Sequence, residues 1–190
     1  MKNLFFLAIV LCISNVGNAQ TSHDNLPQGK AGAGKITWLT VEQAYAANQK
    51  QPRKWMIDVY TDWCGWCKVM DRETFTNPKV ADYVAKNYYA VKLNAEQREP
   101  IMMGKEKFDY VSQGNGGYNL LAAKLMNGQM SFPTVVFLDE KLQMIQPLPG
   151  FQKADIYHQV ITFFGGNHYK SQAFDKFQQD TYVKQYTAAE

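Results

Sequence analysis

The chain has 190 residues, of which 46% are hydrophobic and 14% aromatic, enough for one packed domain with additional segments. Its formal net charge of +3 is too small to favour nucleic acid or an anionic membrane surface as a partner. These values point to a globular protein whose function depends on specific side chains rather than on net charge.

The first residues, 1–19, have the pattern of a secretory signal peptide. Lys2 gives a positive start, Leu4–Ile13 is a short apolar run, and Gly17–Ala19 offers small residues for cleavage before Gln20. This run is too short to span a bilayer, and no later run is longer. We therefore expect an exported protein, periplasmic or secreted, without stable membrane insertion; an uncleaved anchor is the alternative.

Cleavage at this point leaves one cysteine pair. Cys12 lies in the apolar run and is removed, so the mature protein keeps Cys64 and Cys67. In an oxidising compartment a pair so close in sequence is more typical of a working disulfide than of a structural one, because the loop it closes is short. A structural disulfide and a zinc site are the alternatives. Zinc would need two further ligands, which the isolated histidines do not offer, so we expect no metal and no cofactor.

A polar, glycine-rich leader is expected over residues 20–35. It contains most of a phosphate-binding loop at Gly29–Lys35, but Ile36 stands where Ser or Thr is required, which argues against nucleotide binding. Helical and strand patterns then alternate. They predict a helix from Thr40 to Gln51, a strand over 55–60, a helix through about Thr74, a helix from Pro78 to Asn87 and a strand over Tyr88–Leu93.

The segment 95–131 is harder to interpret. Gly114–Gly117 has the composition of a mobile loop, and Leu120–Met126 looks helical. Beyond it, the pattern predicts a buried strand over Phe132–Leu138, a hairpin partner over Leu142–Ile145, a helix over Ala154–Phe164 and a polar helical tail over 166–190. The tail is equally compatible with a docked helix and with a loose segment. Strands alternating with helices indicate an α/β protein with a partly parallel sheet.

The cysteines lie where a buried strand gives way to a helix. Cys64 is expected in the turn and Cys67 in the first helical turn, so a disulfide between them opens and closes with little backbone movement. A thiol at a helix N-terminus faces unpaired N–H groups and the positive end of the helix dipole, which favours the thiolate. Thiolate is the form that attacks disulfides.

Several motifs together resemble the thioredoxin superfamily over roughly residues 38–165. They are, as a set, Trp63–Lys68, Asp58 six residues before the first cysteine, Val91–Asn94, Phe132–Thr134 and Gly150. Asp62–Cys64 with Lys68 and Glu73–Phe75 looks closer to the exported branch that includes the C-terminal domain of DsbD. Trp66 departs from cytosolic thioredoxin, which has proline there.

The resemblance implies a thioredoxin-like fold over 36–165, with a central mixed sheet flanked by helices. It also implies that the Phe132–Pro133 bond is cis and faces the cysteines, leaving the backbone of Phe132 free to pair with an extended substrate. Substrate contacts would come from Gly65, Phe132 and Thr134. Trp63 and Trp66, expected to be partly exposed, would add an apolar surface for partners or would pack on the loop.

In this interpretation Cys64 is the nucleophile and Cys67, expected to be the more buried, resolves the mixed disulfide. Asp58 lies in an apolar strand, where burial raises the pKa of a carboxyl, and the resemblance makes it the proton acceptor for Cys67. Lys92 on the neighbouring strand is its expected charge partner. The alternative is an edge-strand aspartate that faces water.

The sequence therefore predicts an exported thiol–disulfide oxidoreductase that reduces protein or peptide disulfides or relays electrons, with a membrane electron donor as a further candidate partner. One alternative is an oxidase or isomerase for exported proteins, since the sequence does not set the redox potential. Another is a non-enzymatic thioredoxin-fold binding or chaperone module with an idle disulfide.

Overall fold

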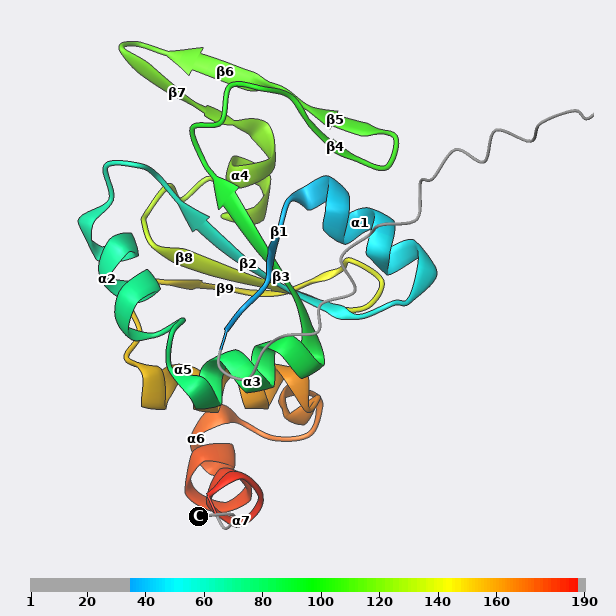
Figure 1. The fold of residues 1–190 in the computed structure, drawn as a ribbon, viewed down its shortest axis with the longest axis vertical. Helices are drawn as coiled ribbons and strands as arrows, with labels where there is room; N and C mark the ends of the chain where they lie inside the picture. The colour runs from blue at the N-terminus through cyan, green and yellow to red at the C-terminus, as the bar shows by residue number, and fades with distance from the viewer. Residues whose placement is uncertain (1–34, 188–190) are drawn as a thin grey trace, which may run out of the picture.

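A mixed sheet forms the centre of the computed structural model, which describes residues 35–187 (Figure 1). Its five strands lie in the order β1 (Trp38–Leu39), β3 (Tyr88–Asn94), β2 (Lys54–Tyr60), β8 (Thr134–Leu138) and β9 (Met144–Pro149). Neighbours among β1, β3 and β2 run parallel, whereas β8 is antiparallel to both β2 and β9. The expected signal peptide and almost all of the leader lie outside the described residues.

Helices cover both faces of this sheet (Figure 1). One apolar cluster joins α1 (Val41–Lys50) and α4 (Leu120–Leu125) to the face that carries Trp55, Ile57 and Val59. The other joins α2 (Gly65–Glu73), α3 (Pro78–Asn87) and α5 (Ala154–Gly165) to the opposite face. Because side chains alternate along β2, Asp58 lies on the second face, among α2, α3 and α5.

Helix starts follow from local hydrogen bonds. Thr40 and Gln43 form a capping box at the start of α1. Asn77 caps α3, whose first position is Pro78, a residue that needs no N–H partner there. These helices and the strands between them lie where the sequence predicts them.

The stretch Gly114–Gly117, expected as a loop, is the turn of a hairpin and the start of its second strand. The segment after β3 forms two hairpins, β4 (Ile101–Met103) with β5 (Glu106–Phe108) and β6 (Tyr110–Gln113) with β7 (Gly116–Asn119). Gly114 has φ of +57°, which suits the short turn between β6 and β7. Gly117 is required because a Cβ there would lie 2.3 Å from the backbone carbonyl oxygen of Val111. Glycine thus serves a tight turn and close packing.

The hairpin partner expected at Leu142–Ile145 is displaced: β9 spans Met144–Pro149, and Leu142 lies in the turn with φ of +63°. The carboxylate of Asp139 accepts the N–H groups of Lys141 and Gln143 and so lengthens that turn. Strand β9 lies at the edge of the sheet. Its prolines are tolerated there because they have no N–H to donate and one side of the strand has no neighbour.

The C-terminal segment is docked, the first of the two alternatives. It comprises η1 (His168–Lys170), α6 (Phe174–Lys176), the π-helical η2 (Phe177–Tyr182) and α7 (Val183–Tyr186). Phe177 is fully buried, with its ring centroid 5.2 Å from that of Phe163 on α5. Figure 1 shows these elements against α3 and α5. Among the helices of residues 35–187, none combines the length and hydrophobicity needed to cross a bilayer.

Candidate active site

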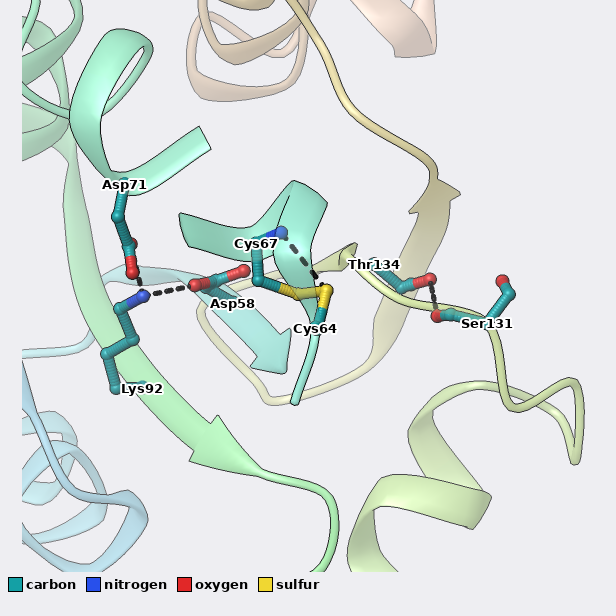
Figure 2. Close-up of a disulfide and its surroundings, with 7 residues drawn as sticks. All are labelled: Asp58, Cys64, Cys67, Asp71, Lys92, Ser131 and Thr134. Carbon is teal, nitrogen blue, oxygen red and sulfur yellow. Dashed lines mark hydrogen bonds and ion pairs between the residues drawn. A yellow bond between two sulfur atoms is a disulfide. The ribbon is translucent and has the colours of Figure 1, made fainter. Parts of the chain in front are cut away.

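The two cysteines form a disulfide at the start of α2 (Figure 2). Cys64 is the N-cap residue, and its sulfur accepts the backbone N–H of Cys67 at 3.0 Å. The sulfur therefore takes the place of the oxygen that usually caps a helix. In the reduced protein the same N–H and the helix dipole favour a thiolate at this position.

The expected difference in burial between the cysteines is absent. Cys64 is 4% exposed and Cys67 3% exposed, so in the disulfide form Cys67 is not appreciably more buried than Cys64. The bond to Cys67 holds the sulfur of Cys64 against the helix N-terminus. What the motif presents to solvent is its pair of indoles, Trp63 at 66% and Trp66 at 61% exposure.

Each indole also contacts a phenylalanine from a distant segment. The ring of Trp63 meets that of Phe132 edge-on, with centroids 5.8 Å apart, and the ring of Trp66 lies 5.4 Å from that of Phe151. Gly65, between them, is exposed and has open space on its Cβ side. The cysteine turn is thus flanked by aromatic side chains that remain accessible to a partner.

Asp58 is buried beneath the cysteine turn in the central strand β2, which is paired on both sides. This excludes the alternative of an edge-strand aspartate. Burial raises the pKa of Asp58 to about 6, although Lys92 opposes the shift and Asp71 adds to it. One carboxylate oxygen, Oδ1, has no hydrogen-bond partner among the described residues. In Figure 2 the carboxylate lies between the Lys92 ammonium and the cysteine pair.

Lys92 is the partner that the sequence predicts for Asp58. The parallel register places the two residues opposite each other, and Nζ lies 2.6 Å from Asp58 Oδ2. The ammonium also lies 4.9 Å from the ring centroid of Trp38 and 5.0 Å from that of Tyr60. Burial lowers the pKa of Lys92, but the carboxylates of Asp58 and Asp71 outweigh it, so that the net pKa is raised.

Asp71 is the residue that the sequence interpretation missed. Its Oδ1 pairs with Lys92 Nζ, so the ammonium joins a buried carboxylate to one that is 45% exposed (Figure 2). The available signal was the spacing of four residues from Cys67, which places both side chains on one face of α2. Because Lys92 is distant in sequence, the spacing alone could not identify the pair.

The loop before β8 completes the site. The Phe132–Pro133 peptide bond is cis, and the β2–β8 ladder ends at Thr134, so the backbone of Phe132 lies beyond the ladder. Thr134 is buried, and its hydroxyl donates to the carbonyl of Ser131 at 2.8 Å (Figure 2). Among the predicted substrate-contacting residues, Thr134 therefore holds the loop rather than offering a free side chain.

Metal ligands do not gather here. Within residues 35–187 no group of three or more His, Cys, Asp or Glu side chains has an arrangement that could hold a metal ion. The site consists of a disulfide at a helix N-terminus, a buried carboxyl beside it, and an ammonium held by two carboxylates. This arrangement is suited to sulfur exchange and proton transfer.

Comparisons with known proteins agree with this geometry. The family model Thioredox_DsbH, described as "Protein of unknown function, DUF255", matches residues 29–170. The thiol:disulfide interchange protein DsbD of Haemophilus ducreyi is 33% identical over 107 residues, which are 56% of this chain and 15% of DsbD. An uncharacterized protein of Caenorhabditis elegans is 27% identical over 77 residues, 40% of this chain and 11% of that protein. The chain thus spans a small part of both curated relatives.

Solved structures agree on the fold. A thioredoxin-fold protein from Helicobacter pylori has a TM-score of 0.53 at 17% identity, covering 77% of this chain and 98% of its own. A thioredoxin from Thermus thermophilus has a TM-score of 0.50 at 15% identity, covering 73% and 99%. The Thioredox_DsbH match covers well over half of the sequence. The chain is therefore a member of the Thioredox_DsbH family, with a thioredoxin fold and a Cys64–Cys67 disulfide at the start of α2.

Proposed function

We propose that this protein reduces protein or peptide disulfides, or relays electrons to them, through Cys64 and Cys67. The observation that carries the proposal is the sulfur of Cys64 at the N-cap of α2, bonded to Cys67 and lying above a buried carboxyl. A disulfide at this position closes through only local movement, and the helix N-terminus stabilises the thiolate that must form when it opens.

In the reaction, the Cys64 thiolate attacks one sulfur of the substrate disulfide and expels the other as a thiolate. The Cys67 thiol then loses its proton to Asp58 and attacks the Cys64 sulfur, which releases the second substrate thiol. The substrate gains two electrons and the protein is left with the Cys64–Cys67 disulfide. With a pKa of about 6, Asp58 is largely ionised at neutral pH and able to accept that proton.

Lys92 would hold the ionised carboxylate of Asp58 in place, and the Phe132 backbone beside Pro133 would pair with an extended substrate segment. Trp63, Gly65 and Trp66 would form the contact surface around the cysteines. The name of the Haemophilus ducreyi relative, thiol:disulfide interchange protein, supports the same chemistry, although the match covers 15% of that protein. We extend the proposal to an exported, periplasmic or secreted location, and to a membrane protein as electron donor.

The test of the proposal is covalent trapping. The Cys67→Ser variant, reduced and then offered disulfide-containing proteins of the exported fraction, should accumulate mixed disulfides through Cys64. Matched Cys64→Ser should accumulate none, because the remaining thiol lacks the N-cap position. Equal labelling of the two variants would contradict the assignment of Cys64 as nucleophile.

The direction of electron flow is tested separately by equilibrating the protein with glutathione buffers. A potential near the reducing end of the thioredoxin-superfamily range supports a reductase or relay. A potential near the oxidising end would instead support an oxidase or isomerase.

A binding module with an idle disulfide is a second candidate, favoured by the exposure of Trp63 and Trp66. It predicts that Cys64→Ser leaves partner binding intact and that substrate reduction is absent in the unmodified protein.

A further inference from the structure

We infer that the hairpin segment after β3 forms a groove beside Cys64 that binds substrate segments carrying a cationic side chain near the target cysteine. The inference rests on the proposed function for its assumption that the bound segment carries a disulfide. The groove has a volume of about 500 Å³, within the size range of specific ligand sites. It belongs to the part of the chain whose sequence pattern was hardest to interpret.

The groove is continuous with the cysteine site. Trp63, the neighbour of Cys64, and Phe132, the neighbour of the cis proline, both line it. Gln113, Gly117 and Tyr118 of the β6–β7 hairpin form its opposite wall. A substrate whose sulfur reaches Cys64 would therefore place the residues next to its cysteine against this wall.

The wall is held in place before any ligand binds. The buried amide of Asn119 donates to the carbonyl of Phe108 and accepts the N–H of Leu121, so it ties β7 to β5 and α4. The N–H of Asn119 also donates to the carbonyl of Ala95 at 2.7 Å, beside Glu96. A preformed wall avoids the entropic cost of ordering a loop on binding.

Charge selects the occupant. Glu96 is the one charged side chain among the described residues that line the groove. Its Oε1 accepts the indole N–H of Trp63 at 3.0 Å, which fixes the carboxylate next to the indole. The guanidinium of Arg98, two residues further along the chain, lies over the ring of Tyr110. Neither Arg98 nor Tyr110 lines the groove.

A carboxylate among aromatic rings attracts an ammonium or guanidinium by both ion pairing and cation–π interaction. The same carboxylate repels an acidic side chain. The chemistry of the groove therefore favours lysine or arginine near the substrate cysteine.

The experiment is an NMR titration of the oxidised full chain with short peptides in which serine replaces the reactive cysteine. One peptide has lysines on both sides of the serine, and its match has glutamates. The Trp63 indole N–H reports binding, its signal being assigned by its loss in Trp63→Phe. We expect the lysine peptide to bind about fivefold more tightly at low salt, since one peptide gains and the other loses a partly exposed charge interaction.

Glu96→Gln should reduce this preference to less than about twofold, because glutamine keeps an acceptor for Trp63 but removes the charge. Glu99→Gln is the matched control: it makes the same change at an exposed residue outside the lining and should keep the preference. Gln113→Lys, at an exposed lining position of the hairpin, should also reduce the preference to less than about twofold, because the added ammonium offsets the charge of Glu96.

Equal affinities for the two peptides, no binding of the lysine peptide, or an unchanged preference in Glu96→Gln would overturn the inference. Because the peptides contain no sulfur, this result is independent of turnover. Selective binding without mixed-disulfide trapping would leave the groove in place and contradict the proposed function. Mixed-disulfide trapping without selective peptide binding would support the proposed function and overturn the inference about the groove.

Discussion

Replacing Asp58 with asparagine should stabilise the oxidised protein at alkaline pH and change it little at acidic pH. Burial raises the pKa of this carboxyl from 3.8 to about 6 in the folded state, despite the ammonium of Lys92. Folding therefore favours the protonated carboxyl. The stability that the protein gains by burying this carboxyl in its protonated form is complete below about pH 3.8 and is lost as the pH rises through about 6. Asparagine has nearly the same shape, can still accept a hydrogen bond from Lys92, and does not ionise.

The size of the effect follows from the two pKa values. Their difference corresponds to roughly 3 kcal/mol of unfolding free energy, at about 1.36 kcal/mol per pKa unit. We therefore expect Asp58→Asn to be more stable than the unmodified protein by about 3 kcal/mol at pH 8, and by less than about 1 kcal/mol at pH 4. In a chain of this size the difference at pH 8 raises Tm by about 6–12 °C.

The assay is urea unfolding of the oxidised proteins at both pH values, extrapolated linearly to water. Asp71→Asn is the matched control, because it removes a carboxylate from the same ammonium at a position that is 45% exposed. It should give no comparable stabilisation. If Asp58→Asn were less stable at pH 8, pairing with Lys92 rather than desolvation would dominate the energetics of the carboxyl. If it differed from the unmodified protein by the same amount at both pH values, the difference would not come from ionisation of the carboxyl. Either result would refute the reasoning.

Three further predictions concern the residues around this carboxyl and the C-terminal segment. Asp71→Asn removes a charge that raises the pKa of Asp58, so the acid limb of the pH profile of kcat/KM should move to lower pH; an unmoved limb would contradict the coupling. Lys92→Met should move that limb to higher pH and cost about 3 kcal/mol at pH 8, but much less at pH 4, in urea unfolding. An equal loss at both pH values would show a packing effect alone. Phe177→Ala should cost about 3–5 kcal/mol in the same assay, whereas exposed Val183→Ala should change stability by less than about 0.5 kcal/mol. A small loss for Phe177→Ala would mean that the C-terminal segment unfolds separately.

Elements whose signals are local could be predicted from the sequence. Thr40 and Asn77 cap their helices through hydrogen bonds to backbone groups two or three residues away, and Cys64 does the same with its sulfur. Such bonds depend on nearest neighbours in the chain, so a sequence pattern is enough to identify them. The strand of Asp58 and its pairing with Lys92 were predictable for a related reason: an apolar run with one carboxyl requires a partner.

The segment 95–131 could not be predicted in the same way. Glycines are common both in mobile loops and in tight hairpin turns, so the composition of Gly114–Gly117 fits either. The outcome depends on the close approach of the Val111 backbone to Gly117 and on the hydrogen bonds of Asn119 to three separate segments. The groove beside Trp63 follows from those contacts, and for this reason it left no recognisable pattern in the sequence.

The sequence by itself determined which residues can carry the proposed chemistry: two cysteines within one helical turn, after a strand that contains a single carboxyl. The tertiary structure decided how accessible and how charged those groups are. It buried Cys64, placed Asp71 on the second side of Lys92, and docked Phe177 against α5. The physical reason is the sequence range of the interactions: the hydrogen bonds of a helix cap join residues only a few positions apart. Burial and charge pairing depend instead on which distant segments meet.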